Sequence, residues 1–329
     1  MPPYPSKERP VLLTGATGFI GQHLYDALRA TGYTVRCASR DPDKARREHP
    51  GPEWVALDLD QPAMLTAALA GCDAAFYLVH ELASGKGYEE RERQAAQHFL
   101  AAAEAASLRR VVYLGGVAPK GAPSPHLASR LRTGEILRSG AVSTIEIRAA
   151  MIIGAGSASW RMVRDLAVRL PFMILPRWLR NRSRPIAIGD VIAALLAALE
   201  LPTRASAWFD APGPEVLTHR EMLMRVAGLS GMRPRVVEVP FITPTLSSYW
   251  ITLVTRCQHH VAQELVQGLL SDLVPEGEGI FAQLPDHRRV PFDEAARRAL
   301  AVENRTVGPA GQLLEALAHR TSAPPRRAG

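Results

Sequence analysis

Three glycines at three-residue spacing constrain the fold more than any other feature of the chain. Gly15, Gly18 and Gly21 lie within VLLTGATGFIGQHL, residues 11–24, between a short apolar run and an amphipathic segment. A backbone that turns sharply from a strand into a helix needs residues without a Cβ at the turn and at the helix–strand contact. The sequence therefore predicts a strand–loop–helix unit whose helix N-terminus can bind an anion.

Apolar runs of strand length then alternate with segments of helix length. The predicted strands cover residues 11–14, 34–38, 54–57, 74–79, 110–114 and 143–148, and the predicted helices cover 19–30, 41–48, 62–70, 89–106 and 126–139. Such alternation with short connections gives right-handed crossovers and a parallel sheet covered on both faces. The expected fold class is therefore α/β, a doubly wound parallel sheet that is Rossmann-like.

The second half of the chain is less regular and predicts a smaller, helix-rich C-terminal lobe that completes a cleft above the sheet. Predicted helices cover 158–169, 189–201, 218–227, 246–255, 258–273, 293–301 and 311–319, with strands at 207–210 and 235–239. We expect a disordered lead over 1–9, a nucleotide-binding domain over 10–155 to which 185–215 returns, a substrate lobe over 156–184 and 216–320, and a disordered tail over 321–329.

Composition excludes several other classes of protein. The chain has 39 basic and 32 acidic residues among 329, and the basic residues are mostly dispersed, so nucleic acid is not an expected partner. Cys37, Cys72 and Cys257 are far apart without metal-ligand spacing, so we expect no metal and a reducing, cytoplasmic location. The longest apolar stretches, such as 191–199, are too short to span a bilayer, which leaves contact with a membrane surface open.

The glycine loop predicts a site for the pyrophosphate of a dinucleotide, because it follows a strand and opens a helix. Backbone N–H groups and the helix dipole at this turn stabilise the negative charge of a pyrophosphate. The residues expected to bind the cofactor here are Gly15, Thr17, Gly18, Phe19, Ile20 and Gly21.

Two later positions bear on the choice of dinucleotide. Ser39 and Arg40 follow the second strand, where NAD-preferring folds carry an acidic residue for the ribose 2′-hydroxyl. The Arg40 guanidinium suits a 2′-phosphate instead, which favours NADP(H) and leaves NAD as the second option. The alternative is a solvated Arg40 paired with Asp41 or Asp43.

Asp58 and Leu59 follow the third strand. Asp58 is placed to accept a hydrogen bond from the adenine amino group. It could equally cap the helix over 62–70, and the sequence allows both roles.

Several motifs resemble those of the extended and atypical short-chain dehydrogenase/reductase superfamily, and most closely its NmrA-like, NAD(P)H-binding branch. They are TGATGFIG (14–21), ASRDP (38–42), LDLDQP (57–62), YLVH (77–80) and YLGG (113–116). A bacterial subgroup also carries the order seen here in HLASR (126–130), GSASW (156–160), PRW (176–178) and PIAIGDV (185–191). The resemblance covers about residues 10–275.

The resemblance implies that NAD(P)(H) lies over the carboxyl ends of the strands, with the substrate between this rim and the second lobe. It places Leu78, Val79 and His80 along the path from adenosine to nicotinamide. The residues that would flank the nicotinamide and its ribose are Gly115, Gly116, Ala149, Ala150, Met151 and Ile152.

The chain departs from the superfamily at the three side chains of its usual chemistry, a Ser, a Tyr and a Lys. Gly115 and Gly116 stand at the Ser position, and His126 and Arg130 stand at the Tyr and Lys positions. Arg130 shares a helix face with His126 and lowers the imidazole pKa, which weakens His126 as an acid at neutral pH. The candidate catalytic residues are His126, Arg130 as a ribose or phosphate contact, and Ser129 as a second proton donor. Alternatively, His126 only begins the helix and Arg130 is solvated.

An arginine-rich segment with interleaved apolar and aromatic residues runs from 160 to 184. One interpretation is an apolar substrate wall with an arginine gate, in which Trp160 and Arg161 contact the substrate. A second is a surface for anionic lipid or a partner protein. A third is a packed helix pair with solvated arginines.

The sequence favours an NADP(H)-dependent oxidoreductase that transfers hydride to a small hydrophobic molecule with an activated acceptor, such as an enone or quinone. These acceptors need less help from a proton donor than a simple ketone does. Loss of the Ser-Tyr-Lys set leaves open a non-catalytic NADP(H)-binding redox sensor or an assembly or scaffold protein. A dehydratase or epimerase is a weaker alternative, and the oligomeric state is not indicated.

Overall fold

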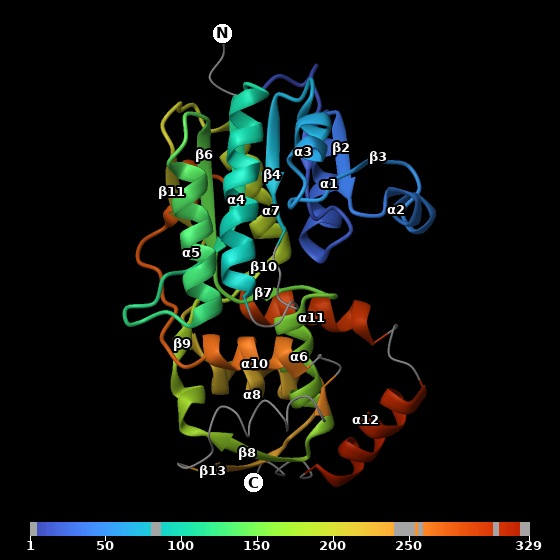
Figure 1. Cartoon of the computed structure of the whole chain (residues 1–329). Helices are drawn as coiled ribbons and strands as arrows, with labels where there is room; N and C mark the ends of the chain where they lie inside the picture. Colours follow the sequence, from blue (N-terminus) through green and yellow to red (C-terminus); the bar gives the residue numbers. More distant parts are fainter. Residues whose placement is uncertain (1–4, 80–86, 240–253, 256–258, 305–308, 323–329) are drawn as a thin grey trace.

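A parallel sheet of seven strands forms the larger part of the molecule (Figure 1). The computed structural model describes residues 5–79, 87–239, 254–255, 259–304 and 309–322. The strands are β1 (Val11–Leu13), β2 (Val35–Ser39), β3 (Glu53–Ala56), β4 (Ala74–Tyr77), β5 (Arg110–Gly116), β6 (Ser143–Ala149) and β11 (Ala207–Asp210). They lie in the order β11-β6-β5-β4-β1-β2-β3, and every neighbouring pair is parallel. The predicted doubly wound α/β fold is confirmed.

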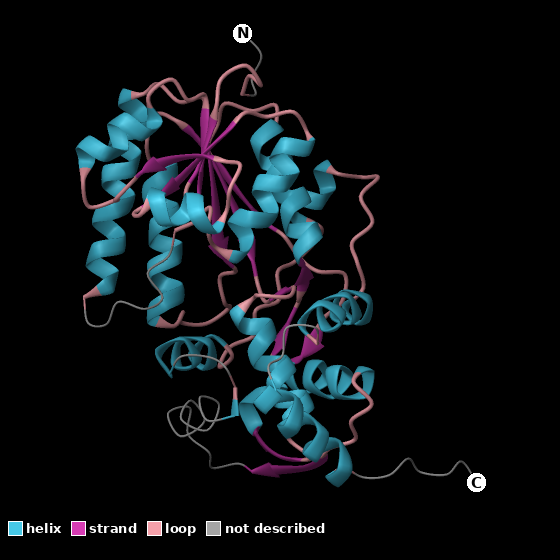
Figure 2. Ribbon diagram, turned by 90° about the vertical axis from the view of Figure 1, so that its right-hand side faces the viewer, coloured by secondary structure: helices cyan, strands magenta, loops and turns pink. Residues whose placement is uncertain are grey.

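Helices cover both faces of the sheet (Figure 2). They are α1 (Phe19–Ala30), α2 (Pro42–Glu48), α3 (Pro62–Leu69), α4 (Tyr88–Ala105), α5 (Pro125–Arg138) and α7 (Ile188–Glu200). Alternate residues of a strand point to opposite faces, so Leu13 of β1 packs in the cluster that contains Leu24 of α1 and Leu195 of α7. Its neighbour Leu12 packs with Phe99 of α4 in the cluster on the other face. Both α7 and β11, which follow residue 185, pack on or join this sheet.

Residues 5–9 differ from the expected disordered lead. The backbone N–H of Ser6 donates to Asp73 Oδ2 at 2.6 Å, and Arg9 Nη1 donates to Asp73 Oδ1 at 3.2 Å. The Asp73 side chain is fully buried beside β4, and a buried carboxylate needs such partners. Ser6 and Arg9 are therefore tied to the sheet.

The second lobe lies below the carboxyl edge of the sheet in the view of Figure 1. Its elements are β7 (Ile152–Ile153), α6 (Ala158–Arg169), β8 (Phe172–Pro176), the 3-10 turn η1 (Arg177–Arg180), β9 (Arg182–Ser183), β10 (Ile186–Ala187), β12 (Leu217–Thr218), α8 (His219–Leu229), β13 (Arg235–Val239), α10 (His259–Gly268), α11 (Phe292–Glu303) and α12 (Pro309–Thr321); a further 3-10 turn, η2 (Gly279–Gln283), packs on α7. The predicted helix over 246–255 lies outside the described residues except for 254–255. None of the helices in the described ranges combines the length and the apolar character that a bilayer crossing needs.

The segment 160–184 does not form the helix pair of the third interpretation. After α6, residues 172–176 form β8, which pairs in parallel with β13. Met173 and Leu175 are buried while Phe172 and Ile174 are about half exposed, which is the two-residue period of a strand. All four of these residues are apolar, so the sequence does not display this alternation.

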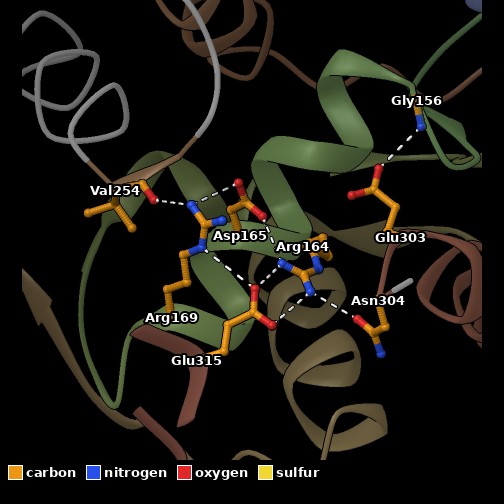
Figure 3. Close-up of polar contacts among 8 residues, drawn as sticks. All are labelled: Gly156, Arg164, Asp165, Arg169, Val254, Glu303, Asn304 and Glu315. Atoms are coloured by element: carbon orange, nitrogen blue, oxygen red, sulfur yellow. Dashed lines mark hydrogen bonds and ion pairs between the residues drawn. The ribbon is translucent and has the colours of Figure 1, made fainter. Parts of the chain in front are cut away.

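A buried ionic network joins α6 to α12 and to Asn304, the residue after α11 (Figure 3). Arg164 is fully buried and donates to Asp165 Oδ1 at 3.1 Å, to Asn304 Oδ1 at 2.9 Å and to the carboxylate of Glu315. Arg169 adds an ion pair to Asp165 Oδ2 at 3.1 Å. Two arginines of the segment are therefore internal, neither solvated nor part of a gate.

We expect Arg164→Leu to lower the free energy of unfolding by about 3–5 kcal/mol, because it leaves the buried Asp165 and the Glu315 carboxylate short of their cation. Urea unfolding followed by tryptophan fluorescence measures this loss. Arg298→Leu is the matched control, since it breaks an exposed pair with Glu294 and should cost less than about 1 kcal/mol. Equal losses in both variants would contradict the assignment.

Candidate cofactor and substrate site

The glycine loop between β1 and α1 is folded tightly against its own backbone and the end of β4. Gly15 has φ +64°, and a Cβ there would lie 2.8 Å from Leu78 O. A Cβ on Gly21 would lie 2.2 Å from Gly15 O, so the first turn of α1 packs directly on the loop. The N–H of Gly18, the N-cap residue, donates to Gly15 O at 2.9 Å. These close approaches exclude side chains at the turn, as the motif predicts.

The N-terminus of α1 has neither a side-chain cap nor an acidic residue in its first turn. Thr17 and Gly18 are exposed there. Thr14 fixes the start of the loop, since its hydroxyl donates to Phe76 O at 2.9 Å and accepts from Leu78 N at 3.0 Å. Uncapped first-turn N–H groups beside a side-chain-free cradle fit the pyrophosphate of a dinucleotide.

Arg40 follows β2 and is exposed. Within the described part of the chain it makes no hydrogen bond or ion pair, since Asp43 pairs with Arg46 at 2.8 Å and Asp41 accepts from Lys44 N at 2.9 Å. The alternative in which Arg40 pairs with Asp41 or Asp43 is therefore not what the structure shows. Its neighbour Ser39 donates to Asp41 O at 3.1 Å.

Asp58 closes a turn after β3 and does not cap α3. Its Oδ1 accepts from Asp60 N at 3.1 Å, while the N-cap position of α3 belongs to Gln61. His98 Nδ1 lies 3.1 Å from Leu59 O. Both Asp58 and Leu59 lie at the same carboxyl edge of the sheet as the glycine loop.

A cavity of about 720 Å³ extends from this edge into the second lobe. First-domain residues that line it include Phe19, Ile20, Gly116, His126, Arg130, Ala149, Ala150, Met151 and Ile152. Second-lobe residues that line it include Met162, Leu166, Met173, Leu175, Trp178, Leu179 and Leu223. Its wall is therefore largely apolar, and it joins the two regions that the sequence assigned to cofactor and substrate.

Several expected residues lie beside this cavity and do not line it. Leu78 and Val79 are half-buried after β4, and Gly115 is buried in β5. His80 lies outside the described residues.

The two glycines at the Ser position are closely packed. A Cβ on Gly115 would lie 2.7 Å from Glu146 Oε1, and one on Gly116 would lie 2.6 Å from Leu127 Cδ1. Glu146 is fully buried and held by Arg138 at 2.9 Å and Arg148 at 2.8 Å. A serine at position 115 would therefore meet this held carboxylate, whereas one at position 116 would require the end of the Leu127 side chain to shift.

His126 lines the cavity from the first turn of α5, which Ser124 caps by accepting from Leu127 N. Burial and, second, the Arg130 cation lower the pKa of His126 to about 4. The imidazole is therefore neutral at neutral pH, in the direction that the i,i+4 spacing predicts. Arg130 also lines the cavity, and one of its amino groups donates to Leu114 O at 2.9 Å.

Ser129 does not lie where the prediction of a second proton donor requires it. It is buried, and its hydroxyl donates to the carboxylate of Glu92 on α4. Among the described residues it does not line the cavity. One residue along a helix turns a side chain by about 100°, so Ser129 faces α4 when Arg130 faces the cavity.

Trp160 and Arg161 likewise do not lie where the prediction of substrate contacts requires them. Trp160 is fully buried in the core of the second lobe, with Met222 and Phe292 in the same cluster. Arg161 donates to Gly156 O at 3.1 Å. Neither belongs to the described cavity lining, to which α6 contributes other residues: Ala158, Ser159, Met162, Val163 and Leu166.

The sequence interpretation missed three polar residues of the lining, Ser183, His219 and Glu264. His219 lies between Thr218 and Glu221, whose capping box was predicted and is present. No motif marked these positions, because Ser183 and His219 come together only through pairing of the short strands β9 and β12, and Glu264 comes from α10.

Residues 15–164 match a family model described as NAD(P)H-binding. The range holds the glycine loop and the strand ends that surround it, so the chain carries an NAD(P)H-binding domain. This match agrees with the NAD(P)H-binding domain that the motifs predicted.

Two curated relatives are reductases of low identity. The ceramide reductase of Caulobacter vibrioides is 26% identical over 234 residues, which cover 70% of this chain and 73% of the relative. The 4-hydroxy-2-methyl-3-oxo-4-farnesyl-3,4-dihydroquinoline-1-oxide ketoreductase of Stigmatella aurantiaca is 22% identical over 346 residues, with 94% of this chain and 98% of the relative covered.

Solved structures share the fold. The triphenylmethane reductase of Citrobacter sp. complexed with NADP(H) has a TM-score of 0.70 at 15% identity, covering 88% of this chain and 100% of that one. MoeE5 in complex with UDP-glucuronic acid and NAD has a TM-score of 0.69 at 18% identity, covering 91% and 100%.

We expect Gly21→Ala to weaken NADPH binding at least tenfold, because the added methyl group would lie 2.2 Å from Gly15 O and push α1 off the loop. Isothermal titration calorimetry measures the change. Gly189→Ala is the matched control, since Gly189 also lies in a first helical turn, has open space around its Cβ position and should gain about 0.5–1 kcal/mol of stability. Unchanged NADPH binding by Gly21→Ala would refute the proposed packing role.

The lowered pKa of His126 makes folding sensitive to acid. Between pH 6.5, the ordinary value, and about pH 4, the unfolded chain binds a proton here and the folded chain does not. The free energy of unfolding should therefore fall as the pH drops through this window, and His126→Gln should reduce the fall. Burial also lowers the pKa of His219 to about 4, so His219 adds to this loss of the free energy of unfolding at low pH.

Histidine ring signals followed by NMR from pH 7 to pH 3.5 test this directly, with His126→Gln identifying the His126 signal. A His126 signal that titrates near pH 6.5 in the folded protein would contradict the burial of its imidazole.

Proposed function

We propose that the protein is an NAD(P)H-dependent reductase that transfers hydride to a small hydrophobic molecule bearing an activated acceptor, such as an enone or quinone. The observation that carries this proposal is the cavity that runs from the cofactor edge at Ala149–Ile152 to the apolar residues of the second lobe. When bound, NAD(P)H supplies the hydride, and the chain supplies orientation and exclusion of water.

The names of two relatives support a substrate with a large apolar part. One is named for ceramide and the other for a farnesyl-bearing quinoline oxide. An extended apolar group fits a wall built from Met162, Leu166, Met173 and Leu223.

The state of the proton donors supports an activated acceptor. His126 stands where the superfamily has its Tyr, and its imidazole is neutral above about pH 4. It can offer a hydrogen bond to a substrate oxygen but carries no acidic proton to release at neutral pH. Arg130 is placed to orient a ribose hydroxyl or the substrate oxygen from the same helix face.

Arg40 supports NADPH over NADH as the preferred cofactor, because it is an exposed guanidinium without a partner among the described residues beyond β2. We expect Arg40→Asp to weaken NADPH binding about ten- to a hundredfold and NADH binding much less. This factor corresponds to the free energy of one charge-assisted hydrogen bond. Fluorescence titration of both cofactors measures this difference. Arg47→Asp carries the same change of charge at an exposed position of α2 and should leave the ratio unchanged.

A second candidate is a non-catalytic NADP(H)-binding sensor or scaffold protein. The packing of Glu146 against Gly115 favours it, because this held carboxylate leaves no room for a serine side chain at position 115. A sensor should bind NADPH without consuming it.

Turnover separates the two candidates. Purified protein should oxidise NADPH in the presence of hydrophobic quinones or enones, seen as loss of NADPH absorbance, and Arg130→Leu should slow this reaction at least tenfold. Tight binding of NADPH without oxidation across a broad panel of such acceptors would favour the sensor instead.

A further inference from the structure

Three polar side chains in the second-lobe part of the cavity contain buried atoms without a hydrogen-bond partner among the described residues. They are Ser183 Oγ, His219 Nε2 and Trp178 Nε1. Ser183 is 1% exposed and His219 is 5% exposed. Buried polar groups are nearly always hydrogen-bonded, because leaving them unpaired costs stability. Three such atoms in the lining of one cavity indicate a missing polar partner.

The backbone brings these residues to one wall. β9 and β12 pair antiparallel, so that Ser183 lies opposite Leu217, two residues before His219. The N–H of His219 donates to Asn181 O at 3.1 Å, which fixes the start of α8 beside β9. Trp178 lies in η1, which packs against α8.

We propose that Ser183, His219 and Trp178 form a subsite for a neutral hydrogen-bonding group, a carboxamide or hydroxyl, on an otherwise apolar substrate. The inference rests on the proposed function, since it assigns this end of the cavity to the substrate. The group to be reduced then lies at the other end, beside His126 and Arg130.

The charges around the subsite select a neutral group. Burial lowers the pKa of His219 to about 4, so its imidazole is neutral and offers one donor and one acceptor. The Trp178 indole N–H only donates, so an ammonium, which has no acceptor, would leave it unpaired, whereas the Ser183 hydroxyl both donates and accepts. Glu264 lines the same cavity and disfavours an anion, while the guanidinium in the described lining, that of Arg130, belongs to the cofactor edge. A carboxamide matches this set of donors and acceptors.

Calorimetric titration of the full chain with saturating NADP⁺ tests the proposal without turnover. The probes are N-methyldecanamide, decanoate and decylammonium, which share one apolar chain and differ in the charge of the head. The amide should bind at least tenfold more tightly than either ion. Equal binding of all three, tighter binding of an ion, or no binding of the amide would overturn the inference.

Substitutions then show which residues contact the polar head group of the amide probe. Ser183→Ala and His219→Phe should each lower the affinity for the amide about three- to tenfold while the melting temperature stays equal or rises, because each removes an unpartnered polar atom. Leu223→Ala, a lining residue without polar atoms, is the control and should weaken all three probes alike. Wild-type affinity for the amide in both polar variants would overturn the inference. The preference of the wild-type chain for the amide over the two ions tests the inference without any variant.

The outcome is separable from that of the proposed function. A protein that oxidises NADPH but binds the three probes alike contradicts only the subsite. A protein that prefers the amide but oxidises no NADPH contradicts the reductase and leaves the binding site in place.

Discussion

The contact between the first turn of α1 and the backbone of the glycine loop is the constraint on which the site depends. Gly21 approaches Gly15 so closely that even a methyl group would not fit, and Thr14 ties the same loop to β4. Because β1 lies between β2 and β4, this contact sits where the sheet changes direction. The strand ends that follow, from Arg40 to Ala149, are arranged around it.

The first domain could be read from the sequence because its signals are local. α1 has the predicted limits, and the limits of α3 and α5 differ from the predicted ones by at most one residue. Short connections between strands and helices leave few topologies open. The direction of the His126 pKa shift followed from its spacing to Arg130, although burial, which sequence does not display, is its larger cause.

The second lobe could not be read in this way, since its signals are long-range. Strands of two residues, such as β9 and β12, carry no periodicity, yet they place Ser183 beside the start of α8. The arginines of 160–184 look alike in sequence but differ in partners: Arg164 meets Glu315, whereas Arg184 donates to Gly213 O. Trp160 shows the same limit, because an aromatic residue in a motif can be core and not a ligand contact.

The ionic network of Arg164 has a consequence for how the chain is made. Its counter-charge on Glu315 lies 151 residues further along. At ribosomal speeds of roughly 5–20 residues per second, that carboxylate emerges about 8–30 s after the guanidinium it neutralises. Until then α6 carries a cation that lacks this counter-charge, so the buried network of the second lobe can be completed only late in translation.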